Sequence, residues 1–291
     1  MKTQAESKLC NLQSTISMPE LPEVETIARG LNQRVAGDVI ESVWLGSKPE
    51  PLKSSAQEIA AALESKLISS VRRVGKHIVF ALAHSKNGAS NSAKETQWIV
   101  HLGMTGSLRV CPPASEVAKH THAILKLASG RELRFVDPRR FGRLSVIEKF
   151  KAPGSEPLDI SFEDFAALFH GRKTPIKSAL LNQKLLSGVG NIYADEALFR
   201  AKIRPRRRAS SLTRDDLRRL RAALKKVLQE AIRAGGSSIS DYVDADGEEG
   251  FFQLKHRVYG REGKPCLVCK MPVKRIVVAG RSSHYCPHCQ M

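Results

Sequence analysis

The sequence predicts a two-domain α+β protein in which an antiparallel β-sandwich or barrel precedes a helical region and a small metal-binding module. Short β-rich runs fill the first half of the chain, helical patterns dominate after residue 161, and four of the six cysteines crowd the C-terminus. A length of 291 residues favours two domains over one, and a hydrophobic content of 42% is enough to form real cores.

The charge balance narrows the class of partner. There are 47 Lys and Arg against 29 Asp and Glu, which gives a formal net charge of +18. A protein this basic is expected to bind a polyanion, most often nucleic acid, and a membrane surface is the weaker alternative. No apolar run is long enough to span a membrane, and the first 17 residues lack the apolar region of a secretory signal. We therefore expect a reduced, cytoplasmic protein.

The first domain is expected over residues 18–150. Residues 1–17 are polar and aperiodic, and they are expected to be disordered or a mis-annotated extension. Apolar residues at helical spacing predict helices over Pro22–Val35 and Ser55–Leu67, and residues 86–95 are predicted to be a polar loop. Strands are predicted over Val39–Leu45, Ile78–Ala83, Trp98–Leu102, Ala123–Leu127, Leu133–Val136 and Leu144–Ile147.

A change of composition marks the second half of the chain. Pro, Gly and Ser in residues 151–161 indicate a linker, which leads into a helical domain expected over residues 162–250 and a cysteine module over 251–291. A Gly/Ser/Asp-rich loop is predicted at Gly235–Gly250. Helices are predicted over Phe162–His170, Ile176–Leu181, Ile192–Arg200 and Asp215–Ala234.

The strongest local signal is a pair of Cys-x-x-Cys turns separated by sixteen residues. Each turn can present two thiolates to one ion, so Cys266, Cys269, Cys286 and Cys289 can complete a tetrahedron around one structural Zn²⁺. The insert between the turns fits a β-hairpin. The alternative is two disulfides or unliganded thiols. Such a closed zinc site folds the module and performs no catalysis.

Three further motifs suit a polyanion, although each has a plain structural explanation. The glycines of "LSGVGN" allow close backbone approach, and Asn191 can cap a helix whose free amides would bind phosphate; the alternative is an interhelix turn. "DPRRFG" and "HLGMTGSLR" combine arginines, Phe141 and Met104, which could grip phosphate and enter a base stack, or could be strand turns with packed side chains. Lys76 is by default a solvated lysine.

Taken in order, these motifs resemble the formamidopyrimidine-DNA glycosylase family. The segments that carry the resemblance are "PELPEVETIARGL", "HLGMTGSLR", "DPRRFG", "LSGVGNIYADEALF" and the four-cysteine finger, and they cover nearly all of Pro19 to Gln290. The first segment differs from the "PEGPE" typical of the sister family, endonuclease VIII. The resemblance implies an N-terminal β-sandwich with flanking helices and a C-terminal helix–two-turn–helix domain that ends in a zinc-finger β-hairpin.

The resemblance also implies an activity: excision of oxidised purines such as 8-oxoguanine and formamidopyrimidines from double-stranded DNA, followed by cutting at the abasic site through β,δ-elimination. The family's nucleophile is an N-terminal proline, which matches Pro19. Within a chain this nitrogen is an amide, whereas at a free terminus it is a secondary amine with a pKa of roughly 8. We therefore expect Met18 to be the true initiator, removed after synthesis. The rival explanation is a real tail that blocks the enzyme.

The other family roles are carried over by position. Glu20 matches the proton donor, Lys76 the lysine that assists β-elimination, and Arg281 the arginine linked to δ-elimination and phosphate contact. Further matches to DNA-contacting or lesion-pocket residues are His120, Arg139, Arg172, Asn191, Met104, Phe141, Lys177 and Glu23. Among these, Met104, Arg139 and Phe141 match the trio that fills the space left by the everted nucleotide. The Gly235–Gly250 loop matches the one that closes over the everted base.

Two hypotheses of different class remain at this point. The first is a bifunctional glycosylase and abasic-site lyase, which acts as a monomer and associates with the bacterial nucleoid. The second is a non-catalytic zinc-finger protein that binds damaged DNA, which applies if Pro19 is not N-terminal. A free amine at Pro19 discriminates between them.

Overall fold

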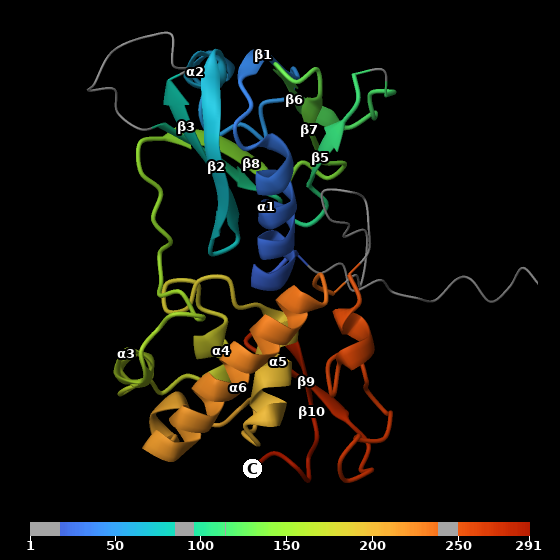
Figure 1. Ribbon diagram of the computed structural model, residues 1–291. Helices are drawn as coiled ribbons and strands as arrows, with labels where there is room; N and C mark the ends of the chain where they lie inside the picture. The colour runs from blue at the N-terminus through green and yellow to red at the C-terminus, as the bar shows by residue number, and fades with distance from the viewer. Residues whose placement is uncertain (1–17, 85–95, 114, 238–249) are drawn as a thin grey trace, which may run out of the picture.

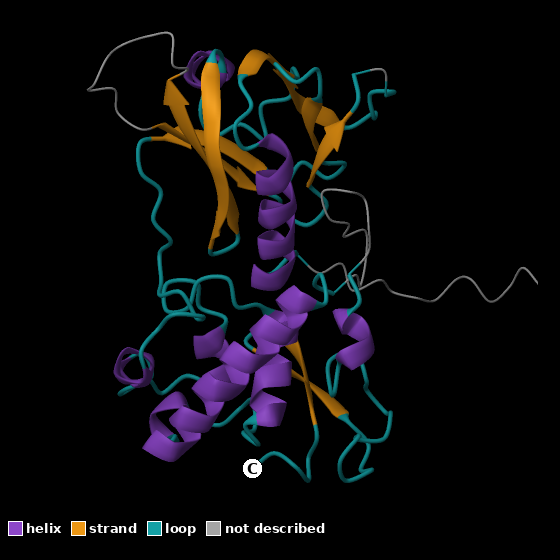
Figure 2. Cartoon of the chain, in the orientation of Figure 1, coloured by secondary structure: helices purple, strands orange, loops and turns teal. Residues whose placement is uncertain are grey.

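The computed structural model describes residues 18–84, 96–113, 115–237 and 250–291. The predicted tail, the polar loop at 86–95 and most of the Gly235–Gly250 loop lie outside these residues. Figures 1 and 2 show two domains, with a β-sandwich above a helical domain that carries a two-stranded hairpin. The predicted α+β architecture is confirmed.

The sandwich consists of two four-stranded antiparallel sheets. One sheet has the order β1-β6-β7-β5 and the other has the order β2-β3-β4-β8. Their buried faces, together with one face of helix α1, enclose a single apolar core. The strands are β1 (Ile40–Leu45), β2 (Lys66–Val74), β3 (His77–His84), β4 (Thr96–His101), β5 (Ser107–Cys111), β6 (Thr121–Leu127), β7 (Glu132–Val136) and β8 (Arg143–Ile147).

Two strands of the sandwich were not predicted. A helix was expected to continue to Leu67, but helix α2 (Ala56–Leu63) ends four residues before that position. Strand β2 already begins at Lys66. A bulge between Ile68 and Ser70 breaks the alternation of buried side chains in β2. Strand β5 follows directly after a glycine turn and is only five residues long. The short length of β5 and the turn before it therefore left too few alternating residues to predict a strand.

The helical domain surrounds a second apolar core. Its helices are α3 (Phe162–Ala167), α4 (Ile176–Leu180), α5 (Asn191–Arg200) and α6 (Arg214–Arg233), and a short 3₁₀ helix, η2 (Phe252–Lys255), leads to the hairpin of β9 (Lys274–Val278) and β10 (Arg281–Tyr285). Helix α6 starts with a capping box, in which Thr213 Oγ1 accepts the Asp216 amide and Asp216 accepts the Thr213 amide. None of the helices in the described parts of the chain is long and apolar enough to cross a membrane.

Helix α1 (Leu21–Val35) connects the two cores. Its N-terminal end extends out of the sandwich to the helical domain (Figure 1), and the turn between β2 and β3 extends in the same direction. Leu31 is fully buried in the sandwich core, whereas Leu21 is fully buried in the helical core. Arg73 joins the domains at the side, because its guanidinium contacts Glu25 of α1 at 2.7 Å and Glu156 of the linker at 2.9 Å.

The division of α1 between two cores predicts different effects for two matched substitutions. Leu21→Ala and Leu31→Ala each remove the same buried atoms, so each should lower the free energy of unfolding by roughly 2–5 kcal/mol. Both tryptophans, Trp44 and Trp98, lie in sandwich strands, so their fluorescence reports on the sandwich, while far-ultraviolet circular dichroism reports mainly on the helices. Leu21→Ala should lower the dichroism midpoint more, and Leu31→Ala the fluorescence midpoint. Identical shifts of both probes in both variants would contradict this division.

Candidate active site

The site forms where the first turn of α1 meets the first turn of α5. Glu20 precedes α1 and is only 2% exposed. Its Oε1 accepts the amide of Ile192 at 3.0 Å and its Oε2 accepts the amide of Tyr193 at 3.4 Å, both from the first turn of α5. The Leu21 amide donates to the Gly188 carbonyl at 3.0 Å. The predicted glycine-rich turn therefore binds a carboxylate of the chain itself.

Glycine is required at this contact for steric reasons. A Cβ at Gly190 would lie 2.2 Å from the Glu20 Cδ, and a Cβ at Gly188 would lie 2.9 Å from the Leu21 Cβ. Gly188 also has a φ of +96°, which disfavours other residues. The two glycines thus let the start of α1 approach the helical domain closely.

The environment of Glu20 favours a carboxyl group that can hold a proton near neutral pH. The pKa of Glu20 is raised to about 7, mainly by burial and also by the nearby Glu23, while Lys76 and the two α5 amides oppose this shift. Lys76 lies at the tip of the β2–β3 turn and is partly buried. Burial lowers the pKa of Lys76, and the nearby Arg281 adds to this, whereas Glu20 and Glu23 counteract it. Pro19 is buried beside Glu20.

Glu23 organises the opposite side of the site. It is 2% exposed, and its carboxylate accepts the Tyr193 hydroxyl and the Ser237 amide, the latter at 2.8 Å. Its other oxygen accepts the Glu20 amide at 2.9 Å. Ser237 pairs with Phe251 across the base of the Gly235–Gly250 loop. Glu23 therefore fixes the base of that loop.

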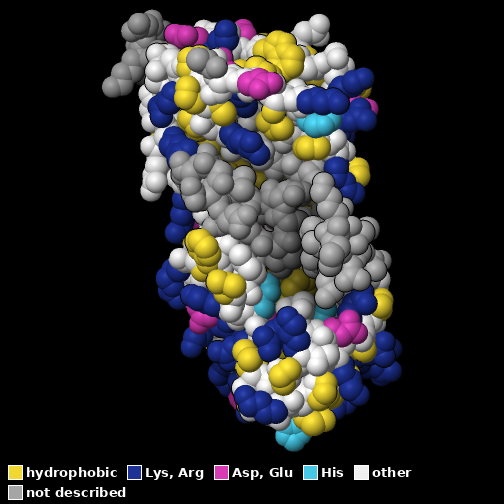
Figure 3. All heavy atoms as spheres, turned by 90° about the vertical axis from the view of Figure 1, so that its right-hand side faces the viewer, with side chains coloured by type: hydrophobic (Ala, Val, Ile, Leu, Met, Phe, Trp, Pro, Cys, Tyr) yellow, Lys and Arg dark blue, Asp and Glu magenta, His cyan; other side chains and the backbone are white. Residues whose placement is uncertain are grey.

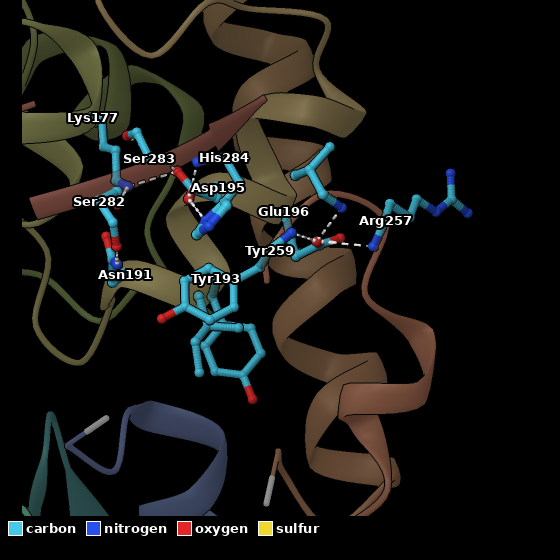
Figure 4. A network of polar contacts seen from close by, with 12 residues as sticks. Lys177, Asn191, Tyr193, Asp195, Glu196, Arg257, Tyr259, Ser282, Ser283 and His284 are labelled. Atoms are coloured by element: carbon cyan, nitrogen blue, oxygen red, sulfur yellow. Dashed lines mark hydrogen bonds and ion pairs between the residues drawn. The ribbon is translucent and has the colours of Figure 1, made fainter. Parts of the chain in front are cut away.

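Lys177 forms an ion pair in the interior of the protein. Its side chain is fully buried, and its ammonium lies 2.7 Å from Asp195 Oδ1 and donates to the Ser282 carbonyl at 2.6 Å. Asp195 also accepts the His284 amide, and Asn191 donates to Ser282 Oγ at 3.3 Å (Figure 4). This network joins α4 and α5 to strand β10, which begins at Arg281.

A second buried acid of α5 anchors the segment that leads to the first cysteine of the module. Glu196 of α5 accepts three consecutive amides, those of Arg257, Val258 and Tyr259, at 2.9–3.0 Å (Figure 4). Sequence reasoning did not single out Tyr193, Asp195 or Glu196 as functional residues. The available signal was the presence of two acids within a helix that is otherwise apolar, "NIYADEALF".

The four cysteines form a site for one structural zinc ion. Cys266 Sγ lies 3.9 Å from Cys289 Sγ, Cys269 Sγ lies 3.4 Å from Cys286 Sγ, and all four sulfurs lie within 4.8 Å of one another. Sulfurs around a tetrahedral zinc lie about 3.8 Å apart, whereas a disulfide requires about 2.05 Å. The amide of Val268 donates to Cys266 Sγ, and the amide of Cys289 donates to Cys286 Sγ. These sulfur–sulfur distances favour a bound metal ion over two disulfides.

The remaining DNA-contact candidates lie at the surface of the sandwich. His120, Arg139 and Phe141 are exposed, Met104 is half-buried, and the Arg139 guanidinium lies 4.8 Å from the centre of the Phe141 ring. On the face shown in Figure 3, Lys and Arg side chains lie on both domains. A surface of this kind suits a polyanion.

Arg172 lies apart from the other candidates. Its Nε donates to the Leu168 carbonyl at 2.5 Å, and its side chain lines an open hollow together with the acids Glu156, Asp159 and Asp164. These acids would repel a phosphate placed there. A DNA contact by Arg172 stays a prediction, and its surroundings do not support it.

Comparison with known proteins agrees with this arrangement. The formamidopyrimidine-DNA glycosylase N-terminal domain matches residues 18–144, the formamidopyrimidine-DNA glycosylase H2TH domain matches 153–243, and the zinc finger found in FPG and IleRS matches 263–290. A formamidopyrimidine-DNA glycosylase from Solibacter usitatus is 48% identical over 281 residues, which is 94% of this chain and 99% of that protein. One from Thermus thermophilus is 45% identical over 286 residues, 94% of this chain and 98% of that protein.

Solved structures show the same fold. The MutM (Fpg) protein from Thermus thermophilus has a TM-score of 0.80 and 44% identity, covering 94% of this chain and 98% of that chain. Lactococcus lactis Fpg in complex with DNA containing an abasic site has a TM-score of 0.83 and 33% identity, covering 94% and 99%. A mutant of the same enzyme with Fapy-dG DNA has a TM-score of 0.84 and 32% identity, covering 94% and 100%. The chain belongs to the formamidopyrimidine-DNA glycosylase family.

Proposed function

We propose that this protein is a bifunctional DNA glycosylase and abasic-site lyase of base excision repair, which acts as a cytoplasmic monomer on double-stranded DNA containing oxidised purines. The observation that carries this proposal is the junction of the buried Pro19 and Glu20 with the partly buried Lys76. It places a potential amine nucleophile beside a carboxyl group whose pKa is about 7 and a lysine whose pKa is lowered. The relatives bound to Fapy-dG and abasic-site DNA support the choice of substrate.

The proposed reaction begins at the nitrogen of Pro19. As a free secondary amine it attacks C1′ of the damaged nucleotide, the bond from C1′ to the base breaks, and the base leaves with the electron pair. Glu20 supplies a proton to the departing base or to the sugar ring oxygen as the ring opens. The product is an iminium between Pro19 and C1′, formed as the bond from C1′ to the ring oxygen breaks and the proline nitrogen gives up its own proton. Because Met18 makes this nitrogen an amide in the 291-residue chain, the reaction requires cleavage after Met18.

Strand cutting then follows from the iminium, which acidifies the neighbouring C2′ proton. Loss of that proton expels the 3′ phosphate, and a second elimination expels the 5′ phosphate. We assign assistance of the first elimination to Lys76 and phosphate contact in the second to Arg281. Asn191 and His120 are proposed phosphate contacts. Met104, Arg139 and Phe141 are proposed to fill the space that the everted nucleotide leaves in the helix.

A covalent trap tests the nucleophile. Borohydride reduces an iminium to a stable bond, so protein that begins at Pro19 should become linked to duplex DNA containing 8-oxoguanine opposite cytosine. The full chain should trap little, because its proline nitrogen is an amide. Pro19→Gly in the trimmed protein should retain some trapping, since a primary amine can still attack. Equal trapping by the intact full chain, with no cleavage visible by mass, would point to a lysine and leave only the non-catalytic role for Pro19.

The raised pKa of Glu20 makes a prediction about stability. Its folded pKa of about 7 exceeds the ordinary value of 4.5, so Glu20 favours folding fully below about pH 4.5, and this contribution is lost as the pH rises through about 7. A difference of this size corresponds to about 3 kcal/mol. Chemical unfolding of wild type and Glu20→Gln should therefore diverge by this amount between pH 4 and 8, with the wild type losing stability. Glu41→Gln, at an exposed site on β1, is the control for removing a carboxylate from the surface.

The same substitution separates binding from chemistry. Glu20→Gln should bind lesion DNA but fail to release the base, because an amide cannot donate the proton. In the wild type, excision should decline as the pH rises above about 7 and Glu20 loses its proton. Rapid base release by Glu20→Gln, measured in single turnover, would remove Glu20 from the proposed role.

The zinc module can be tested with a matched pair of cysteine variants. Cys269→Ser should lose the metal and weaken DNA binding, because the hairpin that carries Arg281 depends on the folded module. Cys111→Ser, at a free cysteine on β5, should keep one zinc per chain and full binding. Metal content and binding affinity provide the measurements. Lesion-specific cutting that survives complete zinc removal would show that the module is dispensable.

A further inference from the structure

Two loops run between the sheets of the sandwich next to each other. The loop over residues 102–106 leaves β4 of one sheet and enters β5 of the other, and the loop over 137–142 leaves β7 and returns to β8. Met104 lies on the first loop, and Arg139 and Phe141 lie on the second. The three side chains proposed to occupy the vacated space in DNA therefore come from separate loops that must be held in register.

The carboxylate of Asp137 lies between these loops and bonds to both. Its Oδ1 accepts the Thr105 hydroxyl at 2.5 Å and the Arg139 amide at 3.3 Å. Its Oδ2 accepts the Gly142 amide at 2.7 Å. Asp137 is 0% exposed, so its charge is stabilised by these donors instead of by water.

The backbones of the two loops pack closely against each other beside Asp137. Gly103 has a φ of +67°, and a Cβ there would lie 2.6 Å from the Phe141 carbonyl carbon. A Cβ at Gly142 would lie 2.5 Å from the Phe135 ring and 3.1 Å from Asp137 Oδ2. The Met104 turn thus rests directly on the backbone of the Phe141 loop, and the carboxylate closes the contact.

The main chain of Asp137 extends the connection to a third segment. Its amide donates to the His120 carbonyl at 2.9 Å, and its carbonyl lies 3.0 Å from His122 Nε2. His120 is exposed and is itself a proposed phosphate contact. One buried residue therefore fixes the backbone next to four proposed DNA contacts without reaching the surface.

We propose that Asp137 is a positioning residue for nucleotide eversion, which rests on the proposed function. It holds Met104, Arg139 and Phe141 in one rigid arrangement, so that the three side chains enter the base stack together. Prior positioning avoids the entropy loss of ordering two loops at the moment of insertion. Asp137 touches neither the lesion nor the reacting atoms, and its effect is expected on insertion and excision in duplex DNA, with little effect on the chemistry of a site that is already unstacked.

A matched pair at Thr105 tests this without removing the buried charge. Thr105→Val keeps the side-chain shape and removes the hydroxyl that binds Asp137, whereas Thr105→Ser keeps the hydroxyl. Asp137→Ala removes all three carboxylate bonds, and Asp137→Asn keeps the shape with one acceptor oxygen. All proteins begin at Pro19, and thermal melting and zinc content identify the variants that remain folded. If Asp137→Ala does not fold, the Thr105 pair decides alone.

Two substrates separate positioning from chemistry. The first is duplex DNA with 8-oxoguanine and an adjacent 2-aminopurine, whose fluorescence rises when a side chain unstacks it. The second is a single-stranded oligonucleotide with an abasic site, which has no base stack to fill. Thr105→Val should lower the fluorescence rise and reduce single-turnover excision from the duplex roughly tenfold. It should leave cutting of the single strand unchanged, and Thr105→Ser should behave as the wild type.

Three outcomes would overturn the inference or its basis. Folded Thr105→Val and Asp137→Ala with wild-type fluorescence and excision would show that the carboxylate does not position the loops. An equal loss on the duplex and the single strand would place the effect on the catalytic centre instead of on insertion. A wild-type protein that cuts neither substrate would overturn the proposed function, on which the role of Asp137 depends.

Discussion

The carboxylate of Glu20 lies where two helices from different domains begin, and the rest of the site is arranged around it. The amides of Ile192 and Tyr193 and the positive end of α5 favour a negative charge at this point, while burial opposes it. Burial outweighs the opposing groups, so the pKa of Glu20 is raised to about 7. This balance exists only because Gly188 and Gly190 leave no side chain between the two helices.

The same junction fixes the relation between the domains. Leu21 belongs to the helical core although its helix belongs to the sandwich, and Arg73 connects α1 to the linker through two ion pairs. A movement of one domain relative to the other would therefore disturb the contacts of Glu20 and displace the Lys76 turn. Structural connection and proposed catalysis use the same few residues, which makes the site sensitive to substitutions that merely loosen the interface.

Buried acids on α5 connect the site to the zinc module. Asp195 pairs with Lys177 and accepts the His284 amide of strand β10, while Glu196 accepts three amides that lie before the first cysteine of the module. A buried ion pair contributes little net stability, because desolvation offsets the attraction, but it strongly penalises arrangements that separate the partners. The hairpin that presents Arg281 is thereby held in one position relative to Asn191 and Glu20.

Much of this protein could be predicted from its sequence. Periodicity placed α1, α5 and α6 within a residue or two, and the Cys-x-x-Cys spacing identified the zinc ligands, because both depend on local geometry. The resemblance to the family, and not the residues by themselves, identified Glu20 and Lys76 as candidates. Strand β2 was missed, since its bulge disrupts the alternation that a strand prediction needs, and β5 was missed because it is short and follows a tight turn.

Only the tertiary structure decided what the candidate residues do. Lys177 and Arg172 look alike as basic residues in the sequence, yet one is buried against Asp195 and the other lies beside acids of the linker. The pKa of Glu20 and the bond between Asp137 and Thr105 depend on segments far away along the chain, which no local pattern encodes. Residue type and spacing determined which groups are present, and burial and long-range contacts determined their charge, orientation and partners.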